Sequence, residues 1–395
     1  MKPRLLMVGT AYAIKEHRKK LDYIANDFAL TCVTARECGG FGWLESTAAN
    51  ESGAGYRLIG LALGGASVAG TRCWYRGLAK VFREESYDLI LVENEPWGIL
   101  RWQSWLLKAC FQPQARFGEF TWENVERAGW KGKVLSLVYR LAAWSSSFVI
   151  GGNHEAGAIM RRRGSAPETV ASLPQFGVDP LLFCPLGESE RQDARAALAI
   201  PRDAFLIGYC GRLVPEKGIR CLMEAFHALE DPERRIHLLI MGTGELEEEV
   251  REASRRDPRI HFQAASTYPE IASVLQLLDL CVLPSQTSLR PGLWWKEQFG
   301  HILIETMACE VATIGSNCGA IPEVLNDPEA VFAEGDVPAL TNLMQSLIQD
   351  GGSLRQLGAR QRKRVLEVYT HQRVGEMWSA FLLKHLPDKK RSRLA

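Results

Sequence analysis

The chain has 395 residues, of which 46% are hydrophobic and 24% charged, a globular composition that excludes a disordered or fibrous protein. The formal net charge of +1 provides no overall field for gripping a nucleic-acid backbone, so we expect no nucleic-acid partner. Single cores rarely exceed about 250 to 300 residues, so the length predicts two domains with a cleft between them.

Charge and tryptophan are distributed unevenly along the chain. Residues 1–175 contain 22 basic and 16 acidic residues, and eight of the 11 tryptophans lie in the first 150 residues. This combination suits a membrane surface or an anionic, lipid-linked substrate. The alternative is that these side chains are core tryptophans and solvated lysines.

The cysteines and the apolar segments indicate the compartment. The ten cysteines show no C-x-x-C pair and no zinc spacing, which predicts buried free thiols in a reducing cytoplasm rather than disulfides or a metal cluster. The first residues, MKPRLLMVGTAYA, predict a strand rather than a signal peptide, and no segment has the length of a transmembrane helix. We expect a cytoplasmic protein, with peripheral association at the inner face of a membrane as an alternative.

Short apolar strands alternate with helical segments in two series. The first series of strands covers 4–10, 30–35, 87–93, 116–122 and 146–152; the second, after a turn-rich segment at 174–187, covers 204–210, 235–242, 259–264, 280–285 and 311–316. Such alternation predicts two α/β, Rossmann-like domains with doubly wound parallel sheets. A last helix near 372–386 carries Val374, Trp378, Phe381 and Leu382 at helical spacing and is expected to cross back onto the first domain.

Several ligand-binding motifs are absent from the sequence. No G-x-G-x-x-G follows a strand, and G-x-x-x-x-G-K-[ST] is missing, so dinucleotide enzymes and P-loop ATPases are excluded. No two aspartates stand at i and i+2, so a D-x-D metal clamp has no candidate and we predict no metal site. Any bound diphosphate must then be neutralised by protein groups.

The first candidate constellation is the loop Gly211-Arg212-Leu213-Val214-Pro215-Glu216-Lys217-Gly218, between a strand and a helix. Glycine at both ends lets the backbone approach a ligand closely. Arg212 offers a rigid fork of donors and Lys217 a mobile charge, so together they can cover both phosphates of a diphosphate. The alternative is an exposed loop in which these cations are solvated and Glu216 is their partner.

The second constellation is Glu297-Gln298-Phe299-Gly300-His301-Ile302-Leu303-Ile304-Glu305. Phe299 and Gly300 are expected to present free backbone N–H groups to phosphate at a helix start. As ionised carboxylates, Glu297 and Glu305 can accept hydrogen bonds from the hydroxyls of a sugar and of a ribose. Alone, two glutamates near a helix N-terminus are more often surface residues.

Taken in order, GRLVPEKG, GTGELEEEV, EQFGHILIETMA and SNCGAIPEVL closely resemble the retaining glycosyltransferases of family 4. The resemblance covers the second domain and extends weakly into the first through ENEPW, FTWEN and PQFGVDP. It implies the GT-B fold, with an acceptor-binding domain over 1–178 plus the helix 372–395, and a nucleotide-sugar-binding domain over 179–371.

The resemblance also implies a reaction and the residues that perform it. A hexosyl-type group would pass from a UDP- or GDP-sugar to a glycan, lipid-linked or other small hydroxyl acceptor in cell-surface polysaccharide or glycolipid biosynthesis, without a cofactor or metal. Arg212, Lys217 and Glu297 match the catalytic positions. The donor-binding positions are Gly211, Arg212, Lys217, Gly242, Phe299, Gly300 and Glu305. The alternatives are a noncatalytic GT-B subunit that binds nucleotide-sugar and a nucleotide-sugar epimerase.

The sequence departs from the family pattern at two places. Many family members present a histidine from the first domain, but the corresponding segment here, FTWEN at 120–124, contains none. The first 175 residues contain two histidines, His17 and His154, and each is expected at the surface. Glu310 stands where a left-handed cap would normally have glycine, at a cost of roughly 1 kcal/mol.

Acceptor recognition is assigned to the first domain. Its candidates are Glu93, Glu95 and Trp122 at strand ends and the cluster Arg18-Lys19-Lys20, although such a cluster is more often a solvated helix face. The segment 97–111 either docks on lipid through Trp97, Trp102 and Trp105 or packs as an interior helix.

Overall fold

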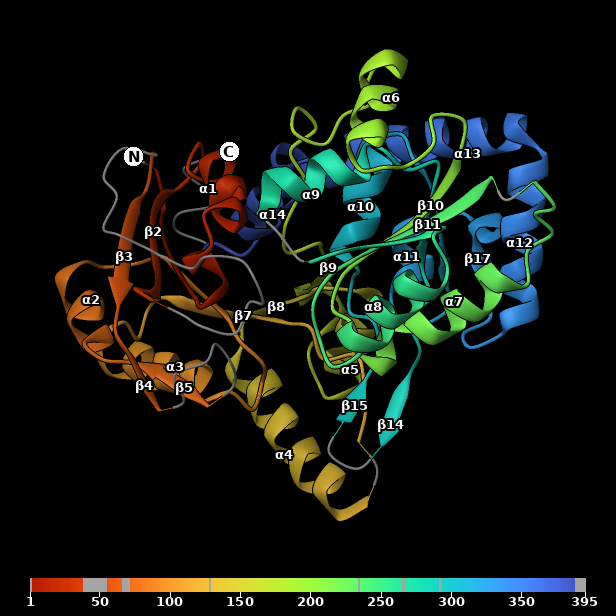
Figure 1. Ribbon diagram of the computed structural model, residues 1–395. Coiled ribbons are helices and arrows are strands. Elements are labelled where there is room, and N and C mark those ends of the chain that lie inside the picture. The colour runs from red at the N-terminus through yellow and green to blue at the C-terminus, as the bar shows by residue number, and fades with distance from the viewer. Residues whose placement is uncertain are drawn as a thin grey trace. The chain divides into compact units, whose positions relative to one another are not determined.

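The computed structural model describes residues 2–37, 55–65, 72–127, 129–233, 235–264, 267–290 and 293–387. Its contacts divide the chain into two compact units (Figure 1). Unit 1 comprises Met1–Gly177 and His371–Ala395, and unit 2 comprises Val178–Thr370. Each unit is an α/β domain built on a parallel sheet, as the alternation of strands and helices predicts.

Unit 1 contains a seven-stranded sheet in the order β3-β2-β1-β6-β7-β8-β9, in which every neighbouring pair is parallel. Its strands are β1 (Arg4–Gly9), β2 (Ala29–Ala35), β3 (Arg57–Leu61), β6 (Leu89–Glu93), β7 (Arg116–Thr121), β8 (Phe148–Gly151) and β9 (Val170–Ser172), with a separate antiparallel pair β4 (Leu63–Gly65) and β5 (Cys73–Tyr75). Its α-helices are α1 (Lys19–Ile24), α2 (Leu78–Glu84), α3 (Ile99–Phe111), α4 (Gly129–Ser145), α5 (His154–Arg162) and α14 (His371–Lys384).

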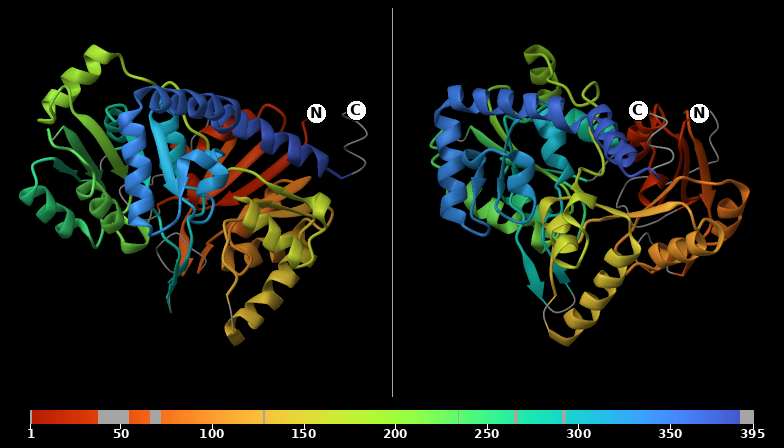
Figure 2. Two further views of the ribbon diagram at one scale, coloured as in Figure 1. Left: turned by 90° about the vertical axis from the view of Figure 1, so that its right-hand side faces the viewer. Right: turned by 180° about the vertical axis from the view of Figure 1, so that it is seen from behind.

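The central strand β1 is buried on both faces of this sheet. Leu5 and Met7 belong to one apolar cluster, and Leu6 and Val8 belong to another. Because successive side chains of a strand point to opposite faces, both faces must be covered by helices, which explains the nearly continuous apolar sequence. Figure 2 shows these helices on both sides of the sheet.

The last helix of the chain, α14, covers one of these faces. Val374, Trp378 and Leu382 are completely buried in the cluster that also contains Leu5 and Met7. The Trp378 ring stacks on Phe120 with their centroids 5.6 Å apart. The helical spacing recognised in the sequence therefore places the apolar face of α14 in the core of unit 1.

The prediction that Arg18, Lys19 and Lys20 form a solvated face is wrong for two of them. Arg18 is 3% exposed and donates to the Tyr12 carbonyl oxygen at 2.9 Å. Lys20 is fully buried, with Nζ 3.4 Å from Glu93 Oε1 and 3.2 Å from the Trp378 ring centroid. Burial lowers the pKa of Lys20 to about 8, against the opposing influence of Glu93. The short helix α1 packs under α14, so part of its charged sequence points inward.

Unit 2 contains a six-stranded parallel sheet in the order β12-β11-β10-β13-β16-β17. Its strands are β10 (Phe205–Cys210), β11 (Ile236–Met241), β12 (Ile260–Gln263), β13 (Leu280–Leu283), β16 (Ala312–Ser316) and β17 (Val331–Phe332), with a separate hairpin of β14 (Ser288–Arg290) and β15 (Leu293–Trp295). Its α-helices are α6 (Glu188–Ala197), α7 (Ile219–His227), α8 (Glu247–Arg256), α9 (Tyr268–Leu275), α10 (His301–Ala308), α11 (Ile321–Leu325), α12 (Val337–Gln349) and α13 (Gly351–Arg364).

The prediction of buried free thiols holds for most of the described cysteines but not for all. Cys32, Cys210 and Cys281, which lie in strands, are buried, whereas Cys110 in the last turn of α3 is exposed, so the prediction is wrong for that residue. None of the helices in the described part of the chain has the length and apolarity that a membrane span requires.

Candidate functional site

The strand order of unit 2 reverses between β10 and β13, so the loops after these strands meet at the carboxyl edge of the sheet. The first loop runs from Gly211 through a 3₁₀ turn, Pro215–Lys217, to Gly218. Gly218 has a φ of +71°, and a Cβ there would lie 1.9 Å from the Pro284 carbonyl oxygen, at the end of β13. Only glycine allows this contact.

The loops that follow β10 and β11 are also in backbone contact. Gly211 N–H donates to the Met241 carbonyl at 3.0 Å. A Cβ at Gly242 would lie 1.9 Å from the Gly211 carbonyl oxygen. The structure therefore brings together Gly211 and Gly242, two of the predicted donor-binding positions.

Lys217 and Glu297 form the polar centre of this edge. Lys217 Nζ lies 2.5 Å from Glu297 Oε2, and the Ser285 hydroxyl donates to the same oxygen at 2.7 Å. Burial opposes ionisation of Glu297, but the charge and hydrogen bond of Lys217, followed by Ser285 and Arg212, outweigh it and lower the carboxyl pKa. The pair is a buried carboxylate and a cation at the switch point of the sheet.

Arg212 occupies a more open position in the same loop. Its side chain is 53% exposed, and its guanidinium lies 3.8 Å from Glu216. Its backbone carbonyl accepts a hydrogen bond from the Tyr209 hydroxyl at 2.8 Å, which fixes the loop. The alternative drawn from the sequence, an exposed cation with Glu216 as its partner, describes Arg212 but not Lys217.

Phe299 and Gly300 precede α10. Gly300 has a φ of +77° and is the N-cap residue of the helix. The Phe299 side chain is 5% exposed and packs edge-on against Tyr369, with ring centroids 5.8 Å apart. Only the backbone of Phe299 is therefore available to a phosphate, and the predicted role of its N–H group stays a prediction.

Glu305 lies on α10 in a separate polar pair. Its carboxylate accepts a hydrogen bond from the Tyr268 hydroxyl at 2.9 Å. Burial raises the pKa of Glu305 to about 7, and the Tyr268 hydrogen bond opposes this shift only in part. The permanently ionised carboxylate expected from the sequence is thus a group that titrates near neutrality.

Sequence reasoning missed three side chains of this region. Ser285 directly follows the end of β13, so the rule that ligands bind beyond the carboxyl ends of strands was a sufficient signal. Tyr268 begins α9 and has no sequence signal. His301, the first residue of α10, packs against Phe299, and burial lowers its pKa to about 4, so its imidazole is neutral.

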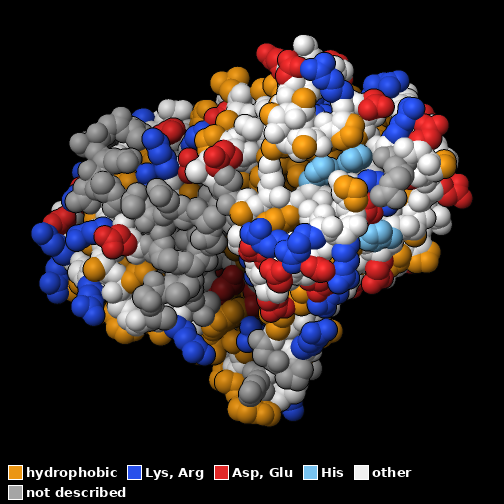
Figure 3. All heavy atoms as spheres, viewed as in Figure 1, with side chains coloured by type: hydrophobic (Ala, Val, Ile, Leu, Met, Phe, Trp, Pro, Cys, Tyr) orange, Lys and Arg blue, Asp and Glu red, His pale blue; other side chains and the backbone are white. Residues whose placement is uncertain are grey.

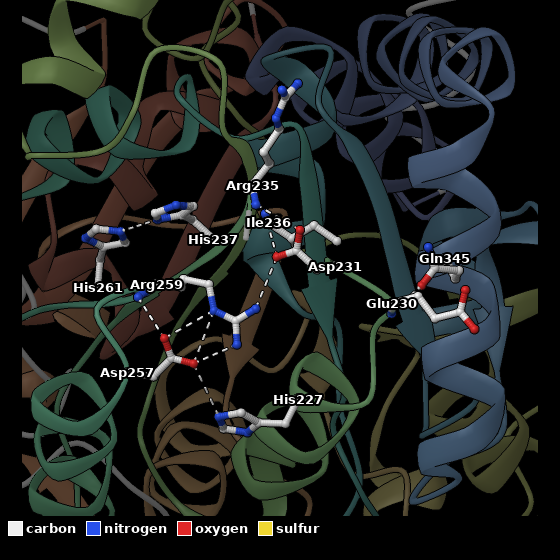
Figure 4. A network of polar contacts seen from close by, with 10 residues as sticks. All are labelled: His227, Glu230, Asp231, Arg235, Ile236, His237, Asp257, Arg259, His261 and Gln345. Carbon is white, nitrogen blue, oxygen red and sulfur yellow. Dashed lines mark hydrogen bonds and ion pairs between the residues drawn. The ribbon is translucent and has the colours of Figure 1, made fainter. Parts of the chain in front are cut away.

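A second polar network lies near the amino ends of β11 and β12, away from Gly242 (Figure 4). His237 Nδ1 and His261 Nε2 are 2.9 Å apart, and the Arg259 guanidinium joins Asp257 at 2.7 Å and Asp231 at 3.1 Å. These contacts hold the edge strand and its flanking turns. Residues 265–266, which come after β12, lie outside the described residues.

Three of the acceptor candidates are engaged within unit 1, and one of them, Trp122, donates its indole N–H to Gln175 Oε1 at 2.8 Å. Glu93 accepts from Gln175 Nε2 at 2.6 Å and from the Tyr12 hydroxyl. Glu95 accepts from the Trp122 N–H at 3.1 Å, and burial raises the pKa of this carboxyl.

The two first-domain histidines lie in different surroundings. His17 is partly buried and stacks on Phe176 with a centroid distance of 4.0 Å, so it is less exposed than a residue of the open surface. His154 is exposed and begins α5, where Asn153 caps the helix by accepting from the Ala156 N–H at 2.8 Å.

Comparison with known proteins identifies the class of unit 2. Residues 190–364 match the family model of the glycosyl transferases group 1. The described chain has the overall fold of sucrose-phosphate synthase from Thermosynechococcus elongatus, with a TM-score of 0.70 at 20% identity, covering 97% of this chain and 99% of that one. A UDP complex of Anabaena HepE gives a TM-score of 0.70 at 15% identity, covering 97% and 100%. The predicted GT-B fold is confirmed, and unit 2 contains a glycosyl transferases group 1 domain.

Similar curated proteins include bacterial glycosyltransferases. A GDP-mannose-dependent phosphatidylinositol monomannoside mannosyltransferase from Corynebacterium glutamicum is 29% identical over 215 residues, which cover 54% of this chain and 55% of that protein. The capsular polysaccharide biosynthesis glycosyltransferase CapM from Staphylococcus aureus is 28% identical over 186 residues, covering 46% and 47%. The chain therefore spans about half the length of the curated relatives it matches.

Proposed function

We propose that this protein is a retaining glycosyltransferase of family 4, which moves a sugar from a UDP- or GDP-sugar to a hydroxyl of a glycan or lipid-linked acceptor. The observation that carries the proposal is the Lys217–Glu297 pair, 2.5 Å apart at the switch point of a group 1 domain. Two relatives named for glycolipid and capsular polysaccharide synthesis support the acceptor class, and HepE, solved with UDP, supports the donor class.

The proposed roles follow from the charge that develops during the reaction. As the bond between the sugar C1 and the phosphate oxygen breaks, the diphosphate gains negative charge and the sugar acquires oxocarbenium character. Arg212 and Lys217 are then the groups that stabilise the departing diphosphate more strongly than the ground state. Two protein cations supply the charge that a metal supplies elsewhere, so no metal or cofactor enters the proposal.

Glu297 is proposed to contact the donor sugar and Glu305 the ribose. Glu297 has a lowered pKa and stays a carboxylate, able to accept hydrogen bonds from hydroxyl groups. The acceptor oxygen would attack C1 on the face from which the diphosphate leaves, and its proton would pass to the departing phosphate oxygen. No protein nucleophile is needed for this displacement.

The test is incubation of the full chain with a panel of UDP- and GDP-sugars, with and without EDTA. We expect slow release of UDP or GDP from one donor, undiminished by EDTA, and a released sugar whose first-formed anomer retains the donor configuration by NMR. Binding without release would instead identify a noncatalytic subunit, and an isomeric nucleotide-sugar would identify an epimerase. An inverted first-formed anomer would contradict the retaining mechanism.

A further inference from the structure

A short hairpin of unit 2 lies immediately beside the Lys217–Glu297 pair. Its strands, β14 and β15, are in the segment between Ser285, which follows β13, and Glu297. The Ser285 hydroxyl donates to Glu297 Oε2 at 2.7 Å, so a side-chain hydrogen bond joins the two ends of this segment. Figure 1 shows the hairpin projecting from unit 2. The base of the hairpin therefore coincides with the polar centre of the candidate site.

The start of the hairpin is tied to the loop that carries Lys217. The Gln286 N–H donates to the Glu216 carbonyl oxygen at 2.8 Å. The Thr287 N–H and hydroxyl both donate to Glu334 Oε2, at 2.6 and 2.9 Å. These bonds hold the first strand against two other parts of unit 2, and the second strand takes its position from the pairing with the first.

The second strand brings Trp295 to Lys217. Trp295 lies opposite Ser288 in the antiparallel register, and the Ser288 hydroxyl donates to the Leu293 carbonyl oxygen at 3.1 Å. Lys217 Nζ is 4.9 Å from the centroid of the Trp295 ring, which is within the range of a cation–π interaction. The ammonium thus has two neighbours that attract it, the Glu297 carboxylate at 2.5 Å and the ring.

The hairpin sequence supplies a ring to Lys217 but no competing carboxylate. Residues 286–296 contain Arg290 and Lys296 and neither aspartate nor glutamate. Figure 3 shows basic side chains on the surface over the hairpin as it is labelled in Figure 1. An aromatic ring attracts a cation through its quadrupole and does not neutralise it, because the ring has no net charge. Trp295 can therefore hold the ammonium in place and leave its charge available to a diphosphate.

We infer that Trp295 is a positioning residue of the proposed transfer reaction, whose ring holds the Lys217 ammonium where the departing diphosphate gains negative charge. This role rests on the proposed function and deepens it. Lysine is a point charge on a flexible stem, and one hydrogen bond to Glu297 leaves part of that flexibility. The ring restricts it further. A charge that is already in place stabilises the transition state without reorganisation at the moment of reaction.

The first test is steady-state release of UDP or GDP from the donor that the unaltered protein hydrolyses. Trp295→Leu should lower kcat by about 5- to 30-fold, which is the loss of one cation–π interaction of a largely buried ammonium. The donor KM should change by less than about twofold, because Lys217 is proposed to act mainly on the departing diphosphate. Trp295→Tyr should recover most of the rate, since a smaller aromatic ring still attracts the ammonium.

The matched control is Trp294→Leu, in which the neighbouring tryptophan of the same strand is replaced. Both tryptophans are partly exposed, but successive side chains of a strand point to opposite faces, so Trp294→Leu should keep its kcat. The unfolding temperature of each variant checks that the fold persists. A normal kcat in Trp295→Leu would overturn the inference. Equal rates for Trp295→Leu and Trp295→Tyr would also overturn it, because the ring would then only fill space.

The second test needs no donor. The protein is labelled with fluorotryptophan, and the fluorine NMR resonance that is missing from Trp295→Tyr is that of Trp295. This resonance should move in Lys217→Met/Glu297→Gln, which removes the ammonium, whereas the resonance of Trp294, identified in the same way, should stay. An unmoved Trp295 resonance would overturn the inference. A moved resonance in a protein that releases no nucleotide from any donor would support the contact and overturn only the proposed function.

Discussion

Lys217 and Glu297 are 80 residues apart in sequence, yet the ammonium of one lies 2.5 Å from the carboxylate of the other, with side-chain exposures of 13% and 7%. The attraction between the two charges offsets the free-energy cost of burying each of them away from water. A phosphate that binds Lys217, as proposed, must therefore share it with Glu297, and the pair would link the proposed donor binding to the stability of unit 2.

Removing one member of this pair should destabilise unit 2. Lys217→Met leaves the Glu297 carboxylate buried without a cation, which typically costs about 3–5 kcal/mol. The double variant Lys217→Met/Glu297→Gln should recover at least half of the loss, because the neutral amide can still pair with Ser285. Urea unfolding of the three proteins measures the effect. Equal stability of the unaltered protein and Lys217→Met would show that the pair does not form in solution.

Arg212 should affect turnover without affecting stability. Its side chain is half exposed, so Arg212→Ala should leave the unfolding temperature unchanged while donor hydrolysis falls by about 10²- to 10³-fold. The control is Arg220→Ala, another half-exposed arginine of unit 2, which pairs with Glu249. Near-normal release of nucleotide by Arg212→Ala would remove Arg212 from the proposed mechanism.

Donor affinity should depend on the protonation of Glu305. Because the pKa of Glu305 is about 7, its carboxyl gains the ability to accept hydrogen bonds from ribose hydroxyls as pH rises through this value. We expect UDP or GDP affinity, measured by calorimetry, to rise over the same range. The variant Glu305→Gln reports the titration of the nucleotide itself, and an identical pH profile in this variant would contradict the assignment of Glu305 to the ribose.

The same carboxyl should make the free protein less stable at higher pH. A folded-state pKa of about 7 lies above the usual value of 4.5, so the folded chain binds the extra proton between these values. The resulting stabilisation is fully present at pH values below about 4.5 and is lost as pH rises through about 7. His301 has a pKa lowered to about 4, so it destabilises the folded protein as pH falls below its usual value of 6.5. The contribution of Glu305 is therefore isolated by the difference in unfolding temperature between the unaltered protein and Glu305→Gln, measured across this pH range.

Glu310 has a backbone conformation that favours glycine. Glu310 lies just after the end of α10, and its φ of +63° is the left-handed conformation that the sequence predicts for a cap at this position. Glu310→Gly should stabilise the protein by about 0.5–1 kcal/mol, because the exposed contact of Glu310 with Arg362 at 3.7 Å contributes little. In contrast, Glu376→Gly, an exposed position within α14, should destabilise by about 1 kcal/mol. If Glu310→Gly instead destabilises the protein, the left-handed backbone conformation of Glu310 is not strained.

The sequence was sufficient to predict the long buried strands and the loops that follow them. Continuous apolar runs such as the one in β1 are buried on both faces and have no other stable arrangement. The edge strands β3, β9 and β17 were not predicted; β9 and β17 have only three and two residues, too few for such a run. Their pairing is determined by neighbours distant in sequence.

The site residues were predictable where a loop follows a strand, and less so where a partner comes from elsewhere. The proximity of Lys217 and Glu297 follows from the switch point of the sheet. The pKa of Glu305 depends on burial by α9 and on Tyr268, neither of which a local pattern reveals. Lys20 shows the same limit: its sequence neighbours are charged, but its contacts are Glu93 and Trp378.

The helix α14 is made after unit 2 but completes the core of unit 1. During synthesis, residues 178–370 emerge as one uninterrupted segment and can fold as soon as they leave the ribosome. Residues 1–177 emerge earlier, yet one face of their sheet, including the pocket around Lys20, has no cover until Trp378 is translated. We therefore expect the first half of the nascent chain to wait, exposing apolar surface to chaperones, while the second half reaches its final structure first.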